Sequence, residues 1–283
     1  MKILIIGNTS IVGKKLINQL ESKKEIEIFT TGRSKNPDIL LDFDNHFLPG
    51  NIEKYRFDLI IHCVANFEET SVEGSFNNIK VNTLGAVKVV DIAIKTQCKR
   101  IISLSSISTI SHPRNEYYNS YGISKKAASE IFQLLSKEYG IEYLELSPSQ
   151  IYDDTGEEKK HQSLLYFIID KASRGQSITF FGERDVERNY IFLSDLVNII
   201  EKAAFSKITG VYYCCHPKNY KISEIAKIAF KTFENPIQYN FDYNQKNLKT
   251  VFIPNNNELY ELINYTPKVD LKEGMKLIKQ KLY

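Results

Sequence analysis

The stretch "KILIIGNTSIVG", Lys2–Gly13, decides the fold of this chain. Its apolar run is typical of a buried strand, and it leads into a turn bounded by Gly7 and Gly13 at the start of a helical pattern. In a strand, glycine turn and helix, the backbone N–H groups at the helix N-terminus can bind a pyrophosphate. Gly7 gives the turn its conformational freedom, and Gly13 lets the helix pack close to the strand. The stretch therefore predicts a dinucleotide-binding turn, with an ordinary strand-to-helix turn as the alternative.

Beyond this turn, short apolar runs alternate with helical patterns as far as about residue 150. The expected strands are "KILIIG", "EIEIFTT", "FDLIIHCVA" (57–65), "RIISLSS" and "IEYLELSPS", and the expected helices cover about 12–21, 78–96 and 120–139. Short apolar runs that are separated by helices predict a parallel sheet buried between two layers of helices. The expected fold class is therefore α/β, with a Rossmann-type doubly wound parallel sheet.

The regularity weakens after about Ile151, where the polar segment "YDDTGEEKKHQ" follows. We expect residues 1–150 to form a dinucleotide-binding Rossmann domain. Two later segments, "NYIFLSDL" and "GVYYCC", resemble buried strands, so a return segment of this domain is expected at about 189–215. Residues 151–188 and 216–283 are expected to form a smaller C-terminal substrate-binding lobe over the C-terminal edge of the sheet, where ligands bind in open α/β sheets.

The composition is that of an ordinary soluble globular protein. The chain has 283 residues, of which 42% are hydrophobic and 25% charged, and its net charge of +3 is too small to favour nucleic acid or a membrane surface as a partner. No apolar run approaches the roughly 20 residues that a membrane span needs, and the N-terminus lacks the pattern of a signal peptide. No pair among Cys63, Cys98, Cys214 and Cys215 has metal-ligand spacing, so we expect no metal site, reduced thiols and a cytoplasmic location.

The residues after the second expected strand bear on the cofactor. NAD-binding folds commonly place an acid about 20 residues past the glycine turn, where it accepts a hydrogen bond from the ribose 2′-hydroxyl. Here "FTTGRSK" has no acid, and Arg33, Ser34 and Lys35 follow the strand directly. A guanidinium matches a 2′-phosphate that a carboxylate would repel, so NADP(H) is favoured over NAD(H). The alternative is that Arg33 and Lys35 are only solvated loop charges. Further on, "LDFD" lies where such folds place an acid near the adenine, which makes Asp42, with its neighbour Phe43, a candidate contact.

Eight motifs occur in an order and at separations that accident does not explain. They are "GNTSIVG", "DLIIHCVAN", "VNTLG" (81–85), "SLSS" (103–106), "YGISK" (121–125), "LSPSQIY" (146–152), "RNYIFLSD" (188–195) and "YTPKVDLKEG". In these motifs, and over nearly its whole length, the chain resembles the extended short-chain dehydrogenase/reductases of the NAD-dependent epimerase/dehydratase type. It departs from their glycine turn at Ser10, which stands in the place of the middle glycine.

The resemblance and the chemistry indicate the same catalytic candidates. A ketone that accepts a hydride needs a proton on its oxygen, and Tyr121 would supply it. A phenol titrates near pH 10, so a nearby cation is needed to favour the phenolate, and Lys125 lies one helical turn later on the same face. In the resembled family this lysine also binds the nicotinamide ribose. A hydroxyl at a strand end completes the set, and by the family match it is Ser106, with Ser105 as the alternative.

The resemblance also implies which residues surround the cofactor and the substrate. Cofactor contacts are expected at Gly7, Thr9, Ser10, Ile11, Val12, Gly13, Arg33, Ser34, Asp42, Phe43, Val64, Ala65, Asn66, Asn82, Tyr121, Lys125, Ser147 and Pro148. Substrate contacts are expected at Asn66, Ser106, Gln150 and Arg188. An arginine in the place of Arg188 binds the diphosphate of a sugar nucleotide in the family, a task that suits a bidentate guanidinium. The chain departs from the family at Ser147 and Gln150, which replace an arginine and an asparagine.

The residues beside Ser106 narrow the reaction. Family members that remove water carry Asp-Glu after this hydroxyl, the decarboxylating members carry a Glu near it, and some epimerase-reductases use a neighbouring Cys as a base. Here Ile107 and Ser108 follow, which leaves hydride transfer with one proton, in a keto-sugar reductase or a 4-epimerase. With Arg33 in place of an acid, the sequence favours an NADPH-dependent reductase of a nucleotide-activated 4-keto-6-deoxy sugar. An NAD-dependent 4-epimerase and a non-catalytic dinucleotide-binding protein are the alternatives.

The helices expected at 78–96 and 120–139 carry apolar residues on more than one face, for example Val90, Ile94 and Leu134. In the resembled family these two helices form a four-helix bundle between subunits. We therefore expect a homodimer through these helices.

Overall fold

The computed structural model describes residues 1–32, 37–43, 48, 50–68, 70–255 and 257–283. The chain divides into two compact units. Unit 1 consists of residues 1–111, 118–147 and 199–213, and unit 2 consists of residues 112–117, 148–198 and 214–283. Each unit is therefore assembled from segments that are separated in the sequence.

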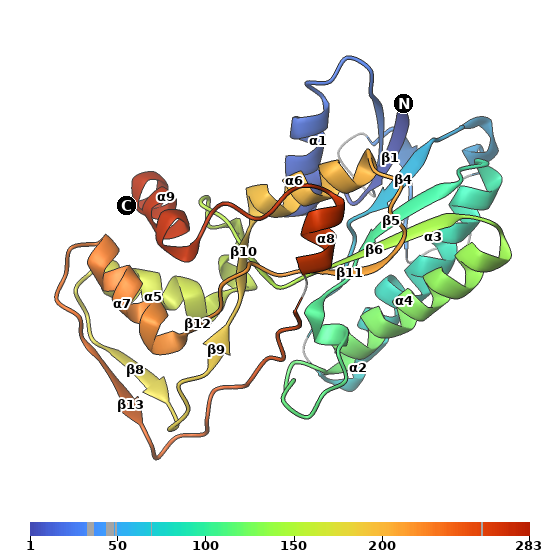
Figure 1. Cartoon of the computed structure of the whole chain (residues 1–283). Coiled ribbons are helices and arrows are strands. Elements are labelled where there is room, and N and C mark those ends of the chain that lie inside the picture. The colour runs from blue at the N-terminus through green and yellow to red at the C-terminus, as the bar shows by residue number, and fades with distance from the viewer. Residues whose placement is uncertain (33–36, 44–47, 49, 69, 256) are drawn as a thin grey trace. The chain divides into compact units, whose positions relative to one another are not determined.

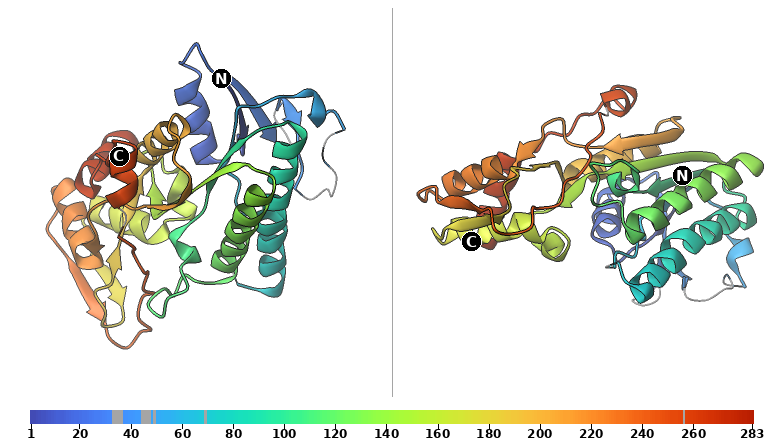
Figure 2. Two further views of the ribbon diagram at one scale, coloured as in Figure 1. Left: turned by 45° about the vertical axis from the view of Figure 1, so that its right-hand side comes forward. Right: turned by 90° about the horizontal axis from the view of Figure 1, so that it is seen from below.

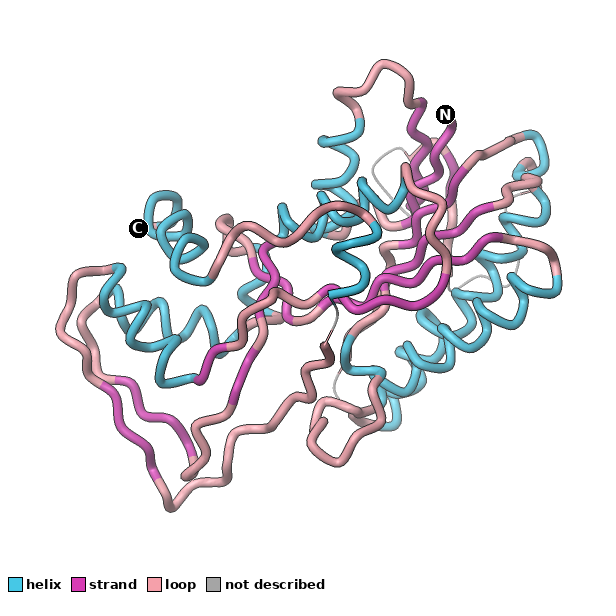
Figure 3. Tube along the Cα trace, in the orientation of Figure 1, coloured by secondary structure: helices cyan, strands magenta, loops and turns pink. Residues whose placement is uncertain are grey.

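Unit 1 is built on a seven-stranded sheet, whose strands are magenta in Figure 3. The strands are β1 (Lys2–Ile6), β2 (Glu27–Gly32), β3 (Ile39–Leu40), β4 (Leu59–His62), β5 (Arg100–Leu104), β6 (Glu142–Pro148) and β11 (Gly210–Cys214). Their order is β11-β6-β5-β4-β1-β2-β3, and the pairs from β6 to β3 are parallel. This is the doubly wound order, in which the winding reverses between β1 and β4. The predicted α/β class and Rossmann-type parallel sheet are confirmed.

Helices cover both faces of this sheet (Figure 1). They are α1 (Ile11–Leu20), α2 (Val72–Asn78), α3 (Leu84–Lys95), α4 (Ser120–Glu138) and the C-terminal part of α6 (Leu193–Ala204), with a short 3-10 turn at Ile52–Lys54 (η1). α3 and α4 lie side by side on one face, as both views in Figure 2 show. On the α1 side, Glu201 of α6 accepts a hydrogen bond from Gln19 and pairs with Lys23 at 2.9 Å. Two helix layers explain why most residues of the central strands are apolar on both faces.

The core of unit 1 includes residues of the sheet and of the α3–α4 layer, among them Leu4, Ile60, Val89, Val90, Ile101, Ala128 and Phe132. The buried positions of α4 recur every three or four residues, at Lys125, Ala128, Phe132 and Ser136. This is the period of a helix that lays one face on a sheet. The packing of α4 therefore carries Lys125 into the interior.

The helix expected at 78–96 begins earlier and is not uniform. It starts at Val72 behind Ser71, whose side chain accepts a hydrogen bond from Gly74 N at 2.9 Å, and it passes through a π-helical turn at Ile79–Thr83 (η2) before α3 begins. The polar sequence "SVEGSFNN" lacks the apolar period by which a helix is recognised, so the pattern does not predict this first part. π-helical turns are frequent at functional sites, and this one contains Asn82.

Unit 2 has its own apolar core. Its helices are α5 (Ser163–Ser173), α7 (Ile222–Thr232), α8 (Asn257–Leu262), α9 (Leu271–Leu282) and the N-terminal part of α6, with a 3-10 turn at Glu157–Lys160 (η4). Three small sheets pair β7 (Gln150–Tyr152) with β10 (Tyr190–Phe192), β9 (Glu187–Arg188) with β12 (Tyr220–Lys221), and β8 (Ile178–Phe181) with β13 (Tyr239–Asp242). The core includes Leu165, Ile169, Phe180, Ile225, Phe230 and Met275. Within the described ranges of both units, no helix is long and apolar enough to span a membrane.

The return of the chain to unit 1 differs from the expected segment at about 189–215. The motif "NYIFLSDL" forms β10 and the start of α6, and β10 pairs with β7 inside unit 2. Unit 1 takes residues 199–213, most of which belong to α6 and to the edge strand β11. A short apolar run predicts a buried strand, but its composition does not say with which strand it pairs.

His62 ends β4 on the face of the sheet that α4 covers. Its side chain is 1% exposed, and neither ring nitrogen has a hydrogen-bond partner among the described residues. Its ring centre lies 5.8 Å from that of Phe132 and 6.1 Å from that of Phe43. Burial, with a further contribution from the charge of Lys125, lowers the pKa of His62 to about 3, so the imidazole is neutral in the folded protein.

We predict that His62→Leu makes the protein less sensitive to acid. Below pH 6.5 the unfolded chain binds a proton at His62 that the folded chain rejects, so wild-type stability falls as the pH drops toward 3. Between neutral pH and about pH 5, wild type should lose about 2 kcal/mol more than the variant. Urea unfolding of both proteins at the two pH values measures this difference. Equal losses in the two proteins would mean that His62 is protonated in the folded state.

Candidate functional site

The turn between β1 and α1 is closely packed around its two glycines. Gly7 has a φ of +110°, which side chains rarely allow, and a Cβ on it would lie 3.0 Å from Val64 Cγ2. A Cβ on Gly13 would lie 2.1 Å from Gly7 O, so the first turn of α1 rests directly on the end of β1. The helix N-terminus therefore lies at the carboxyl edge of the sheet, where the winding reverses. The predicted cofactor contacts between the two glycines are Thr9, Ser10, Ile11 and Val12.

Ser10 stabilises this turn. Its Oγ accepts a hydrogen bond from Gly13 N at 3.0 Å and donates one to Gly7 O at 2.8 Å, which makes Ser10 the N-cap of α1. The serine that stands in place of a middle glycine is thus part of the helix start. Its presence does not open or distort the turn.

The turn fits the pyrophosphate of a dinucleotide. The first N–H groups of a helix have no partner within the helix and can point toward an anion at its end. Asn8 adds a polar atom beside them, because its Oδ1 is buried without a partner in the described part of the chain. A Cβ on Gly32, at the end of β2, would come within 2.9 Å of this oxygen. The sequence pattern does not predict the contribution of Asn8.

The two residues expected to distinguish NADP(H) from NAD(H), Arg33 and Ser34, lie outside the described residues. Before them, β2 ends at Gly32. The carboxylate of Asp38 contacts β2. Its Oδ2 accepts hydrogen bonds from Thr30 N at 2.7 Å and from Thr30 Oγ1 at 3.0 Å. Both bonds hold this carboxylate against the strand. The sequence pattern does not predict this contact.

Asp42 and Phe43 lie beside α3. The Lys88 ammonium donates to Phe43 O at 2.8 Å and to Asp42 O at 3.4 Å, and it lies 5.8 Å from the centre of the Phe43 ring. A Cβ on Gly85 would meet this ring at 3.0 Å. α3 therefore holds the backbone of both residues, whose contact with an adenine stays a prediction.

Hydrogen bonds of the Asn82 side chain connect the loop after β4 to the start of α4. Its Oδ1 accepts a hydrogen bond from Asn66 N at 2.7 Å, and its Nδ2 donates to Asn66 O and to Ser124 Oγ, both at 2.9 Å. Ser124 Oγ in turn donates to Tyr121 O at 2.8 Å. The amide of Asn82 thus makes three bonds within the protein and holds the predicted cofactor-binding segment 64–66 in place.

Asn78 supports the same loop, and the sequence analysis missed it. Its side chain is fully buried, its Oδ1 accepts a hydrogen bond from Asn66 Nδ2 at 3.0 Å, and its Nδ2 donates to Ser120 Oγ at 3.2 Å. Asn78 and Asn82 are four residues apart, so they leave the helical segment on one side. That spacing is the feature of the sequence from which the pair could have been recognised.

Lys125 is a buried cation at the end of a strand. Its side chain is 4% exposed, and its Nζ donates a hydrogen bond to Leu104 O, at the end of β5, at 2.6 Å. Burial lowers the pKa of Lys125 to about 8, and the negative charge of Glu145 opposes this shift. At neutral pH the side chain is therefore an ammonium group.

Tyr121 lies one turn before Lys125 in the first turn of α4. The N-cap of this helix is Asn119, whose Oδ1 accepts a hydrogen bond from Gly122 N at 3.2 Å. The ring of Tyr121 meets the ring of Phe67 edge to face, with 4.8 Å between ring centres. Because residues four apart on a helix share a face, Tyr121 and Lys125 leave α4 on the same side.

Ser106 follows β5 and caps the 3-10 turn Ile107–Thr109 (η3). Its Oγ accepts a hydrogen bond from Ser108 N at 3.1 Å. A hydroxyl that accepts in this way keeps its own hydrogen for donation. The alternative hydroxyl, Ser105 Oγ, is buried and has no hydrogen-bond partner within the described ranges.

Ser147 and Pro148 end β6. The Ser147 side chain is fully buried, and its Oγ donates a hydrogen bond to Glu145 Oε1 at 3.1 Å. This hydroxyl is therefore bonded inside unit 1, and a contact of Ser147 with a cofactor would have to use its backbone.

The substrate candidates Gln150 and Arg188 belong to unit 2. Arg188 is 1% exposed, and its guanidinium donates hydrogen bonds to Glu187 O and to Lys249 O, both at 2.8 Å. The guanidinium lies 5.7 Å from the centre of the Tyr117 ring, and the Lys249 ammonium lies 5.9 Å from the same centre. Two cations therefore share one aromatic ring, and the sequence pattern predicts neither Tyr117 nor Lys249 beside Arg188.

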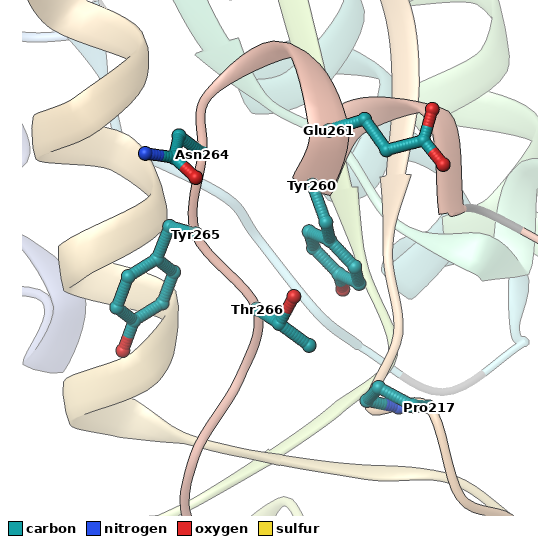
Figure 4. A pocket seen from close by; sticks show the side chains of 6 residues that line it. All are labelled: Pro217, Tyr260, Glu261, Asn264, Tyr265 and Thr266. Carbon is teal, nitrogen blue, oxygen red and sulfur yellow. The ribbon is translucent and has the colours of Figure 1, made fainter.

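A pocket of unit 2 lies beside α8. Figure 4 shows its lining residues, which are Pro217, Tyr260, Glu261, Asn264, Tyr265 and Thr266. Tyr265 OH donates a hydrogen bond to Asp195 Oδ1 at 2.6 Å, and Tyr260 OH donates one to Cys215 O. None of the predicted site residues lines this pocket. Over the ranges that the structure describes, no three metal-ligating side chains come together.

Comparisons with known proteins identify the family. The model of the NAD dependent epimerase/dehydratase family matches residues 3–212. A Methanocaldococcus jannaschii protein that carries an unproven assignment as a UDP-glucose 4-epimerase is 24% identical over 304 residues, which cover 98% of this chain and 96% of that protein. UDP-glucuronic acid decarboxylase 2 of Arabidopsis thaliana is 20% identical over 305 residues, which cover 98% of this chain and 67% of that protein.

Solved structures share the fold. The UDP-glucuronic acid 4-epimerase of Bacillus cereus, in complex with UDP-glucuronic acid and NAD, has a TM-score of 0.80 at 16% identity, with 99% of this chain and 98% of that chain covered. The UDP-glucose 4-epimerase of Thermotoga maritima with UDP-glucose has a TM-score of 0.77 at 18% identity, with 99% and 98% covered. The family model extends from β1 to β11 and includes "SLSS" and "YGISK". The chain therefore belongs to the NAD dependent epimerase/dehydratase family and is an enzyme of that type.

Proposed function

We propose that the chain is an NADPH-dependent reductase that transfers a hydride to the C4 keto group of a nucleotide-activated 4-keto-6-deoxy sugar. The observation that carries the proposal is the buried ammonium of Lys125, bonded to the end of β5 one helical turn after Tyr121. A cation in this position favours the phenolate form of the tyrosine. The relatives named above act on UDP-sugars, which supports a sugar nucleotide as the substrate.

In the proposed reaction the cofactor supplies the hydride. Tyr121 donates its phenolic proton to the substrate oxygen as that oxygen becomes an alkoxide. Lys125 stabilises the phenolate that is left. Ser106 donates a hydrogen bond to the same substrate oxygen and orients it. Asn82, through Ser124, holds the start of α4 in place during the proton transfer.

Arg188 and Gln150 are proposed to bind the substrate. Arg188 Nε is buried and has no partner in the described part of the chain, so it can donate to a phosphate oxygen. The ammonium of Lys249 lies over the same Tyr117 ring as Arg188 and adds positive charge within unit 2. Gln150 replaces the family's asparagine and has one more methylene. Its amide therefore lies further from the backbone when it donates or accepts a hydrogen bond with the sugar.

The neighbours of Ser106 argue against two other reactions of the family. Family members that remove water or decarboxylate carry an acidic residue near this hydroxyl, and the chain has Ile107 and Ser108 there. The Arabidopsis relative is a decarboxylase, but its reaction is not proposed for this chain. Hydride transfer with a single proton needs only Tyr121, Lys125 and Ser106.

A second candidate function is 4-epimerisation. It is favoured by the 4-epimerases among the similar structures, one of which is in complex with NAD. Both reactions use the same three residues. They differ in the cofactor, because a reductase consumes NADPH whereas an epimerase returns its NAD at the end of each turnover. The identity of the cofactor therefore separates them.

Tyr121→Phe should lower turnover by about 100-fold or more, because it removes the proton donor and leaves the ring in place. Initial rates of NADPH oxidation with 4-keto sugar nucleotides measure the effect. Tyr139→Phe, at the other end of α4, is the matched control and should keep the wild-type rate. Near wild-type turnover of Tyr121→Phe would contradict the assignment of Tyr121 as the proton donor.

Arg33→Ala should weaken NADPH binding by about tenfold or more, because a hydrogen bond to a charged group contributes about 1.5–3 kcal/mol. NADH binding should change little. Isothermal titration of both cofactors, before and after the substitution, measures the two effects. Wild type that binds NADH more tightly, or purified protein that releases NAD in mass spectrometry, would favour the epimerase.

A homodimer through α3 and α4 is also proposed. Exposed apolar side chains gather on these two helices, including Val87, Ile94, Ile123 and Leu134. Leu134 is 67% exposed and is the most exposed of these four side chains. The two helices lie side by side and could form half of a four-helix bundle.

Leu134→Glu should shift the protein toward the monomer, because a charge in an apolar interface has no partner. Sedimentation equilibrium of wild type and variant over a range of concentrations measures this. Phe181→Glu, an equivalent change at an exposed position of unit 2, is the control and should leave the dimer intact. A wild-type protein that is monomeric throughout would contradict the proposal.

A further inference from the structure

Arg188 is a buried cation of unit 2 that has no carboxylate partner in the described part of the chain. Its guanidinium donates hydrogen bonds to two backbone oxygens only, Glu187 O and Lys249 O, both at 2.8 Å. Among the same residues, its buried Nε has no hydrogen-bond partner. Burial of a charge is costly unless an opposite charge or further hydrogen bonds compensate it. Arg188 therefore keeps an unbalanced positive charge inside unit 2.

The ring of Tyr117 lies beside this guanidinium. The guanidinium carbon is 5.7 Å from the ring centre, and the ammonium of Lys249 is 5.9 Å from the same centre. Both distances are within the roughly 6 Å over which the face of an aromatic ring attracts a cation. Lys249 likewise has no carboxylate partner among the described residues. Two cations without counterions thus share one uncharged ring.

Hydrogen bonds attach the segment that carries Tyr117 to the segment that carries Lys249. Glu116 N donates to Thr250 O at 3.1 Å, and Glu116 Oε2 accepts from Thr250 N at 2.7 Å. Thr250 Oγ1 donates to Arg114 O at 2.8 Å. Both segments belong to unit 2. The neighbours of the ring in the chain therefore hold it beside Lys249, and the adjacent carboxylate of Glu116 is used by these bonds.

An aromatic ring stabilises a buried guanidinium in a different way from a carboxylate. A carboxylate in the place of Tyr117 would neutralise Arg188 and would repel a phosphate that approached it. A ring attracts the cation but carries no net charge, so the guanidinium keeps its charge and its Nε–H for an anion. The arrangement therefore suits a ligand that brings its own negative charge.

We propose that Tyr117 is a positioning residue that holds Arg188 and Lys249 as a charged pair for the diphosphate of a sugar nucleotide. Its ring takes the place of a carboxylate, which would stabilise the two cations but compete with the ligand. The statement about the ring and the cations concerns the protein alone. Its consequence for binding rests on the proposed function, in which Arg188 binds the substrate.

Tyr117→Glu separates this role from a purely structural one. The new carboxylate should pair with Arg188, so the midpoint of urea unfolding should stay the same or rise, while the affinity for UDP should fall by about tenfold or more. UDP is the probe because the relatives named above act on UDP-sugars, and isothermal titration in excess NADPH measures its affinity. A joint loss of stability and affinity, or an unchanged affinity, would overturn the proposal.

Tyr117→Leu and Tyr117→Phe test the ring itself. Tyr117→Leu should weaken UDP binding by about fivefold or more, and Tyr117→Phe, which keeps the ring, should restore most of the affinity. Tyr239→Leu is the matched control, because Tyr239 of β13 also has a cation near its ring, the ammonium of Lys227 at 6.0 Å, and should leave UDP binding unchanged. If Tyr117→Phe binds UDP as weakly as Tyr117→Leu, the ring does not hold the cations.

Arg188→Met distinguishes failure of this inference from failure of the proposed function. If the ring of Tyr117 holds Arg188, the stability losses of Tyr117→Leu and Arg188→Met should be less than additive in the double variant. Additive losses in urea unfolding would contradict the inference. If the losses are not additive but Arg188→Met binds UDP as tightly as wild type, the proposed binding role of Arg188 fails and the contact between ring and cation stands.

Discussion

The hydrogen bond from the Lys125 ammonium to Leu104 O is the interaction on which the proposed catalytic site of unit 1 depends. It joins α4 to the end of β5, directly before Ser105 and Ser106. Burying Lys125 has a cost, because the fall of its pKa from 10.5 to about 8, which burial causes, corresponds to about 3 kcal/mol of stability at neutral pH. This cost is relieved only as the pH rises above 8. A lysine kept buried at such a cost is typical of a functional site.

Polar contacts from several segments surround this lysine. On the helix side, Asn82 joins the loop after β4 to Ser124, next to Lys125 in the chain. On the sheet side, Glu145 is held by Tyr143 and Ser147 and opposes the effect of burial on Lys125. The β1–α1 turn meets a different demand, because backbone N–H groups at the start of α1 would bind the anion proposed there. Its glycines are required by close approach of the backbone, whereas the proposed catalytic role of α4 requires specific side chains.

Most of the fold and part of the site could be predicted from local patterns. α4 runs from Ser120 to Glu138, nearly as its period predicts, because one helix face is buried along its whole length. The helical start at Val72 was not predicted, since its sequence is polar, and the pairing of β10 with β7 was not, since composition does not specify partners. The buried positions of Asn78 and Glu145 were not predicted either, for a related reason. A single polar residue in a helix or strand has the same local pattern whether it faces water or the interior.

The sequence by itself determined the α/β class, the family and the position of Tyr121 and Lys125 on one helix. These features follow from residues that are close in the chain, such as a glycine turn after a strand or two residues four apart. Only the tertiary structure decided that Lys125 is buried, that Glu145 opposes the effect of burial on it and that Asn82 holds the neighbouring loop. Those contacts join segments that are distant in the chain. They depend on strand register and on the packing of α4 against the sheet, which local patterns do not contain.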